Sequence, residues 1–165
     1  MGLILINIVV WLFFHLTISL GLLKIPYTWF SYEHKLNVLF KKRAFEQEGK
    51  LWRNVFKVQK WKDSLPDGAS LFKAGYKKKK LPEAQIESLE VFIKETKRAE
   101  LTHILLLVPA PLFYLWNPIW AGHIMILYAV IINIPFIIIQ RYNRIRLEKI
   151  VNVLRKKLTD KNPNL

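Results

Sequence analysis

The sequence contains no cysteine, and this absence removes several kinds of chemistry at once. Without a thiol there is no disulfide, no thiolate nucleophile and no thiolate metal site, although the redox compartment stays undetermined. Glycine is also scarce, with six residues that never cluster, so the chain has no glycine-rich phosphate-binding loop. The G-x-S-x-G and H-E-x-x-H patterns are missing as well. The chain therefore lacks the common sequence motifs of nucleotide-binding proteins and of enzymes that form a covalent intermediate.

Acidic residues are few, with 12 Asp and Glu against 26 Lys and Arg, which gives a net charge of +14. Hydrophobic residues nevertheless make up 52% of the chain, and they are gathered into long blocks separate from the lysines. Such segregation is typical of a membrane protein. Because the basic blocks lie beside the apolar ones, anionic lipid headgroups explain them better than nucleic acid does.

Three apolar blocks are candidate membrane spans, since about 20 apolar residues cross a bilayer as a helix. They are residues 2–23, 101–116 and 119–139. The first has only His15 as an ionisable group, and without a preceding basic residue or an A-x-A-like site we expect it to stay attached. The second is short and contains Pro109 and Pro111, so a re-entrant segment is the alternative. We expect an all-α integral membrane protein forming one domain over residues 1–165.

The distribution of Lys and Arg predicts the orientation in the cell membrane. Residues 24–100 hold eighteen of them and the tail, residues 141–165, holds the other eight. By the positive-inside rule this multi-pass protein has both regions in the cytoplasm and its N-terminus outside. Aromatic and basic residues alternate in "KIPYTWFSYEHKLNVLFKKRAF" and again in "LWRNVFKVQKWKDSLPDG", a mixture typical of interfacial amphipathic helices.

A helix is expected to begin near Glu83 and to continue into the second span. On it Thr96, Glu100 and His103 share one face between apolar neighbours, at the edge of the hydrocarbon. Such a polar face favours contact with protein or substrate, because ionisable groups at that depth are costly. The alternative is an anchoring helix end with an incidental contact between Glu100 and His103. A single Glu-x-x-His is weak evidence for metal, so no metal site is expected.

The end of the third span carries a second polar face. Asn133, Gln140 and Arg144 lie on one side of the expected helix, with Arg141 at its edge. Guanidiniums in this position can bind phosphate or carboxylate in a fork. In the alternative, the arginines anchor the helix and Asn133 adjusts a kink at Pro135.

Three stretches carry a family resemblance: "WRNVFKVQKWKDSLPDG", "IKETKRAELTH" and "YAVIINIPFIIIQRYNRIRL". Over roughly residues 45–150 the chain resembles the glycosyl-4,4'-diaponeurosporenoate acyltransferase family of staphyloxanthin-type carotenoid biosynthesis. The resemblance implies transfer of a fatty acyl group to the sugar C6 hydroxyl of a glycosylated C30 carotenoid acid. Trp61 and Asp67 fall within the first motif and are taken as substrate-binding residues.

Direct acyl transfer is the expected chemistry, because no cysteine exists and no serine lies in a nucleophile motif. His103 is the candidate general base, and Glu100 would orient its imidazole. Arg98 ranks below the two arginines of the third span for contacts with phosphate or oxyanion. The expected substrate-binding residues are Thr96, Trp61, Asp67, Asn133, Gln140, Arg141, Asn143 and Arg144.

The expected partners follow from this chemistry. They are a glycosylated carotenoid lipid as acceptor, an acyl thioester carried by coenzyme A or acyl carrier protein as donor, membrane lipids, and other carotenoid-pathway enzymes. No cofactor and no nucleic acid are expected. The alternative function is a non-catalytic membrane subunit that binds glycolipid or anionic lipid and scaffolds the pathway. A methyltransferase is a third possibility, but no nucleotide-binding pattern supports it.

Overall fold

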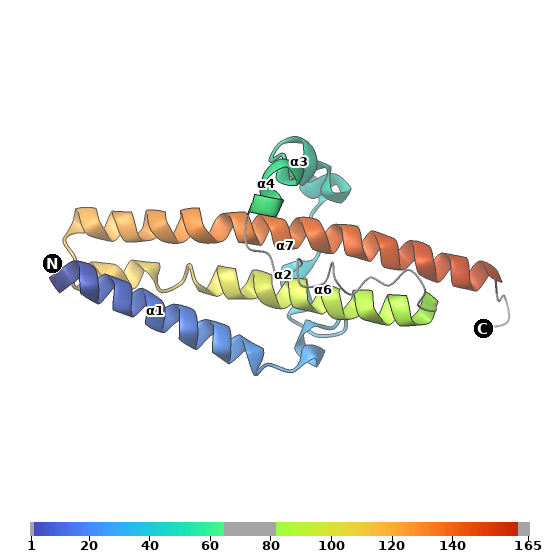
Figure 1. Cartoon of the computed structure of the whole chain (residues 1–165), viewed down its shortest axis with the longest axis horizontal. Helices are drawn as coiled ribbons and strands as arrows, with labels where there is room; N and C mark the ends of the chain where they lie inside the picture. The colour runs from blue at the N-terminus through green and yellow to red at the C-terminus, as the bar shows by residue number, and fades with distance from the viewer. Residues whose placement is uncertain (1, 65–81, 162–165) are drawn as a thin grey trace.

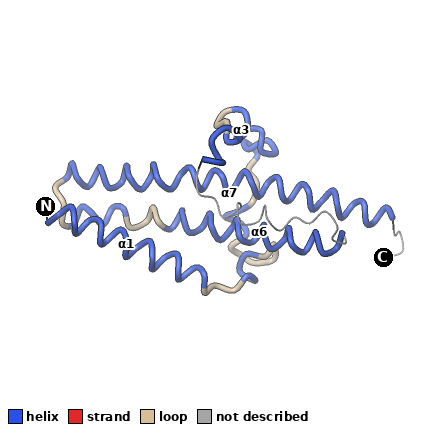
Figure 2. Tube along the Cα trace, viewed as in Figure 1, coloured by secondary structure: helices blue, strands red, loops and turns tan. Residues whose placement is uncertain are grey.

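The computed structural model describes residues 2–64 and 82–161, and within these ranges every regular element is a helix (Figure 2). The long helices are α1 (Gly2–Leu23), α6 (Pro82–Leu105) and α7 (Ile119–Lys161). The short elements are η1 (Tyr27–Phe30), α2 (Asn37–Phe40), η2 (Ala44–Gly49), α3 (Lys50–Asn54), α4 (Val58–Trp61), η3 (Lys62–Ser64) and η4 (Ala110–Leu115). The expectation of an all-α fold is confirmed. Figure 1 shows α6 and α7 running antiparallel, with α1 beside them at one end and diverging from them at the other.

Among the residues that the structure describes, two helices are long and apolar enough to cross a membrane, Gly2–Leu23 and Ile119–Asp160 of α7. Only 11% of the apolar window of α1 and 28% of that of α7 is buried inside the protein. A core helix of a soluble protein would bury most of these side chains. The exposed apolar side chains of both helices suit contact with lipid, which supports membrane association.

The second expected span is not a continuous helix, which corrects the prediction of a helix over residues 101–116. Helix α6 ends at Leu105, turns follow, and the chain resumes as the 3-10 helix η4. Pro109 and Pro111 explain the break, because proline lacks the N–H that an α-helix needs and clashes with the preceding turn. The broken segment still runs beside α7 as far as the end where α1 begins (Figure 1). Irregular backbone of this kind needs cover from protein, and Leu106, Ala110 and Phe113 are buried.

The third expected span continues well beyond its predicted end. Helix α7 has 43 residues and passes through Pro135 without stopping, so the basic tail is helical as far as Lys161. At about 1.5 Å per residue it is about 64 Å long. The sequence contains no glycine or second proline near residue 140 that would end the helix.

Residues 24–64, where the aromatic and basic residues predicted interfacial amphipathic helices, contain only short helical elements. These elements are joined by turns, and Gln47, Glu48 and Gly49 have positive φ angles of 47°, 56° and 86°. This left-handed run kinks the chain at the end of η2, just before α3. Trp52 and Val58 then pack against α7 in one apolar cluster. Several aromatic side chains on the outside stay exposed, including Trp29, Phe45 and Phe56, so interfacial contact remains a prediction.

A polar cluster that the sequence did not reveal joins α1 to the turn before α7. Asn7 and Asn117 exchange side-chain hydrogen bonds of 3.0 and 2.9 Å, and Trp116 Nε1 donates to Asn7 Oδ1 at 2.8 Å. Both amides are buried. Hydrogen bonds between helices satisfy polar groups that lipid would leave unpaired, so this cluster fixes the position of α1.

Candidate functional site

His103 lies near the end of α6 with its ring oriented by two side chains of α7. Its Nδ1 is 2.9 Å from Asn133 Oδ1, and its ring stacks on Phe136 with centroids 4.6 Å apart. Asn133 Nδ2 donates to the carbonyl of Ala129 at 2.9 Å, which fixes the orientation of the amide. Since Asn133 presents an oxygen, His103 Nδ1 must carry the hydrogen. The neutral imidazole therefore has its lone pair on Nε2, where a proton can be accepted.

Glu100 has different partners from the one that the sequence predicted. It is fully buried, its Oε1 accepts a hydrogen bond of 2.9 Å from Arg141 Nη1, and its Oε2 accepts one from Arg144 Nη1. The prediction that Glu100 orients the imidazole of His103 is corrected, because Asn133 has that place. The physical reason is that two guanidiniums of α7 face Glu100. A buried carboxylate is stabilised more by a positive charge than by a neutral imidazole ring.

The ion pairs continue from α7 to the segment between α1 and α6. Arg141 Nε and Nη2 donate to the two oxygens of Glu46 at 2.8 and 3.1 Å. Glu46 also accepts from Trp52 Nε1 at 3.1 Å and from the backbone N–H of Arg43 at 2.6 Å. Burial alone would raise the pKa of Glu46, but the hydrogen bonds from Arg141 and Arg43 outweigh it and lower the pKa. The left-handed turn after Glu46 thus holds a carboxylate that links residues 41–52 to α7.

These contacts occupy the two arginines that were expected to bind substrate phosphate or oxyanion. Arg144 is 2% exposed, and its Nη2 also donates to the carbonyl of Phe40 at 3.4 Å. Arg141 is shared between Glu46 and Glu100. Because both guanidiniums already face buried carboxylates, a phosphate at Arg144 would have to displace an ion pair. The structure favours a structural role for them.

Lys97 is a further buried charge, and it was not among the sequence candidates. It is 1% exposed, its Nζ donates to the carbonyl of Phe30 at 3.0 Å and to Asn37 Oδ1 at 2.8 Å, and it lies 4.1 Å from the centre of the Tyr32 ring. Burial and the charge of Arg144 lower the pKa of Lys97 to about 8. A signal existed in the sequence, because Lys97 is spaced four residues from apolar neighbours on both sides.

A cavity of about 270 Å³ lies between the end of α1 and α6, with His103 in its wall. Its lining residues are Ser19, Leu22, Leu23, Glu95, Arg98, Ala99, Thr102 and His103. Arg98 Nη2 donates to both oxygens of Glu95 at 2.5 Å, and the hydroxyl of Tyr27 also donates to Glu95. Arg98, which ranked below Arg141 and Arg144 in the sequence, thus lies at the cavity of His103. The spacing 95, 98, 99, 102, 103 on one helix is the signal that would have found this face.

The remaining predicted site residues are dispersed. The hydroxyl of Thr96 donates to the carbonyl of Ile93 at 2.8 Å, and Trp61 Nε1 donates to the carbonyl of Phe56 at 2.8 Å. Gln140 is buried and Asn143 is half-buried on α7. Asp67 lies outside the described residues. In the part of the chain that the structure describes, no three His, Asp or Glu side chains gather in a way that could hold a metal ion.

Comparison with known proteins identifies close relatives over most of the chain. The family model described as glycosyl-4,4'-diaponeurosporenoate acyltransferase matches residues 36–153. A protein of that name from Staphylococcus aureus strain MRSA252 is 38% identical over 147 residues, which cover 89% of this chain and 87% of the relative. Proteins of the same name from strains bovine RF122 / ET3-1 and Newman are 37% identical over the same shares. No solved structure matches.

Proposed function

Because the chain belongs to the glycosyl-4,4'-diaponeurosporenoate acyltransferase family, it is an acyltransferase, and we propose that it acts in a membrane on a glycosylated C30 carotenoid acid. The acyl group comes from a thioester and goes to the C6 hydroxyl of the sugar. The observation that carries this proposal is the orientation of His103. Its Nδ1 faces an amide oxygen, which leaves Nε2 as a base beside a cavity of about 270 Å³.

The proposed reaction is direct transfer in which His103 moves one proton. Nε2 accepts the hydroxyl proton of the sugar as its oxygen attacks the thioester carbonyl. When the tetrahedral intermediate collapses, the carbon–sulfur bond breaks and the imidazolium returns the proton to the leaving thiolate. Asn133 accepts the hydrogen bond of Nδ1–H throughout, so its dipole stabilises the positive imidazolium.

The depth of His103 in the bilayer fits both substrates. Its partner Asn133 is 14 residues from Ile119, or about 21 Å along α7, which is about two-thirds of a hydrocarbon core of about 30 Å. A carotenoid chain can stay in the bilayer at this depth while its sugar reaches the cavity near one interface. The thioester of a soluble donor needs to enter only a short distance.

Arg98 is the proposed contact for the donor. It lies in the cavity wall, where its guanidinium is paired with Glu95. This pair is more exposed than that of Arg144 with Glu100, so the guanidinium can exchange Glu95 for a phosphate of coenzyme A or of acyl carrier protein, or for the oxyanion of the intermediate. In the proposed orientation both basic regions and the donor are cytoplasmic and the N-terminus is outside. The protein then resides in the cell membrane, and residues 24–100 lie on the same side as the donor.

The test measures acyl transfer by purified protein in lipid nanodiscs, with the glycosylated acceptor and a palmitoyl-type thioester. His103→Ala should lower kcat by about 10²- to 10⁴-fold, the usual contribution of a general base. His123→Ala is the matched control, because His123 is exposed near the start of α7 and does not line the His103 cavity. Its Nδ1 is 2.7 Å from the carbonyl oxygen of Ile119 and its ring lies edge-on to that of Tyr114. Near-normal turnover by His103→Ala would refute the mechanism, and absence of turnover in the wild type would favour a non-catalytic subunit.

A further inference from the structure

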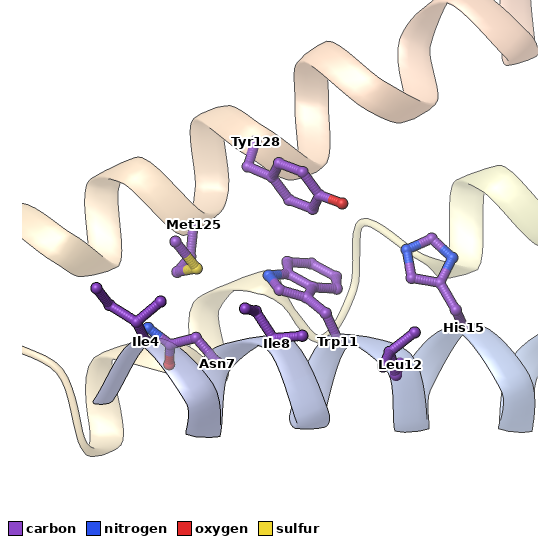
Figure 3. Close-up of a pocket in the computed structure, with 8 residues that line it drawn as sticks. All are labelled: Ile4, Asn7, Ile8, Trp11, Leu12, His15, Met125 and Tyr128. Atoms are coloured by element: carbon purple, nitrogen blue, oxygen red, sulfur yellow. The ribbon is translucent and has the colours of Figure 1, made fainter. Parts of the chain in front are cut away.

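A second cavity, of about 320 Å³, lies between α1 and α7 (Figure 3). Its lining residues are Ile4, Asn7, Ile8, Trp11, Leu12, His15, Met125 and Tyr128. Most of these side chains are apolar, and the volume is at the lower end of the range for small-molecule sites, about 300–1,000 Å³. The cavity extends along α1 from Ile4 to His15, about 16 Å at 1.5 Å per residue. Its length and lining suit a hydrocarbon chain.

One polar atom of a residue that lines this cavity has no partner among the described residues. Trp11 Nε1 is buried and makes no hydrogen bond there, although its ring is fixed by stacking on Phe113 at 4.7 Å. Figure 3 shows the indole lying between α1 and the side chains of Met125 and Tyr128. The indoles of Trp52, Trp61 and Trp116 do have acceptors. Buried N–H groups are nearly always paired, so an occupant with an oxygen acceptor would complete this site.

The cavity is adjacent to the one that contains His103. Ser19, in the wall of the His103 cavity, follows His15 by one turn of α1. His15 also lies within electrostatic reach of His103. A molecule with its reacting group at His103 can therefore extend along α1 past Trp11.

The proposed reaction brings together the acyl chain of the donor and the polyene of the acceptor, and the two molecules differ in the positions of their oxygen atoms. The acyl chain of the donor has no acceptor atom beyond the carbonyl that reacts at His103. The acceptor has an ester carbonyl between its sugar and its polyene, separated from the reacting hydroxyl by the sugar ring. Its conjugated chain can also pack against aromatic faces such as those of Trp11 and Tyr128.

We propose that this cavity binds the glycosyl ester end of the acceptor's polyene chain, with the ester carbonyl accepting the hydrogen bond of Trp11 Nε1. This assignment rests on the proposed function. It adds that α1 contacts the acceptor and not the acyl donor. The rest of the chain continues into the bilayer beside α1. Acceptors that lack the ester carbonyl should bind more weakly, because Trp11 Nε1 would again be unpaired.

Binding can be measured without turnover through the circular dichroism that a polyene acquires in an asymmetric site. Protein in nanodiscs is titrated with the glycosylated acceptor in the absence of donor. Trp11→Phe keeps the ring and removes the N–H, so the Kd of the acceptor should rise about three- to tenfold. Leu12→Trp fills the cavity and should raise this Kd at least tenfold. Leu16→Trp is the matched control, because Leu16 is exposed on α1 and lines neither cavity.

The outcomes separate this inference from the proposed function. If Leu12→Trp raises the KM of the thioester donor and leaves acceptor binding unchanged, the acyl chain occupies the cavity and the inference is wrong. If neither Trp11→Phe nor Leu12→Trp changes either substrate, bilayer lipid fills the cavity and the inference is also wrong. If the wild type binds the polyene and these variants weaken binding, yet no acyl transfer occurs, the cavity assignment stands and the proposed function fails.

Discussion

At the scale of single residues, the partner of His103 decides whether the ring is a competent base. Asn133→Leu removes the acceptor of Nδ1–H, so part of the population adopts the tautomer with its hydrogen on Nε2. We expect kcat to fall by about 10- to 100-fold, a part of the usual general-base contribution, with little change in either KM. Asn133→Asp keeps an oxygen at the same place and should retain most activity. Equal losses in both variants would show that Asn133 acts through packing alone.

Two arginines on different helices should respond differently to the same substitution. Arg98→Gln should raise the KM of the thioester donor and cost little stability, because the ion pair with Glu95 that it breaks is partly exposed in the cavity wall. Arg144→Gln should instead destabilise the fold by about 3–5 kcal/mol, the usual cost of breaking a buried ion pair. Thermal unfolding in detergent and steady-state kinetics on equal amounts of folded protein distinguish the two effects. A donor KM raised only by Arg144→Gln would restore the phosphate-binding interpretation.

Lys97 should make stability depend on alkaline pH. Its folded pKa is about 8, below the ordinary value of 10.5, so between these values the unfolded chain binds the extra proton. Stability must therefore rise with pH in that window and level off above it. The measurement is the midpoint of thermal unfolding in detergent from about pH 7 to 11, compared with Lys97→Met, which lacks the group. If the unfolding midpoints of the two proteins changed with pH in parallel, the lowered pKa of Lys97 would be contradicted.

The sequence could place polar groups on a face but could not choose their partners. Within α6 the spacing of Glu100 and His103 allowed contact, and it predicted correctly that Glu100 is not directed to solvent. Their actual partners, Arg141 and Asn133, lie on α7, and pairing between helices depends on a register that helical periodicity does not contain. Glu46 was missed for the same reason, because its partner Arg141 is 95 residues away in the chain.

At the scale of elements, the packing of η4 on α7 depends on one glycine. A Cβ at Gly122 would lie 2.2 Å from a ring atom of Tyr114, so Gly122→Ala forces the ring or the helix to move. We expect a loss of about 1–3 kcal/mol, typical of overpacking. Gly21→Ala in α1 is the matched control, since nothing lies within 4 Å of its Cβ position and alanine favours helix. Similar unfolding temperatures for both variants would show that Tyr114 has another position available.

Helix boundaries followed the sequence where stop and start signals are local. Pro82 at the first turn of α6 marked its beginning, and Pro109 with Pro111 marked the region where regular helix fails. Pro135 gave no such break, because α7 continues on both sides of it and only one backbone hydrogen bond is lost. Composition alone therefore predicted a continuous helix over residues 101–116, which the structure does not have. It also predicted that the third span ends at residue 139, whereas α7 continues to Lys161.

At the scale of the whole molecule, α7 is longer than any bilayer is thick. Its length of about 64 Å exceeds a hydrocarbon core of about 30 Å by a factor of two, so a crossing by its apolar half would leave its basic half beyond the membrane. The buried pairs of Glu100 with Arg141 and Arg144 lie where the apolar half ends. They join α6 to α7 at the boundary between the apolar and the basic part of α7. The positive charge beyond that boundary determines on which side of the membrane this half lies.

The orientation can be tested with single cysteines, because the chain has none of its own. Ile119, at the first residue of α7, is 73% exposed, and Lys156 is exposed near the other end. A membrane-impermeant maleimide applied to intact cells should label Ile119→Cys and not Lys156→Cys, while both should react after the cells are opened. Labelling of Lys156→Cys alone would invert the orientation. Labelling of both in intact cells would mean that α7 does not cross, and the donor could then not reach His103 from a cytoplasmic face.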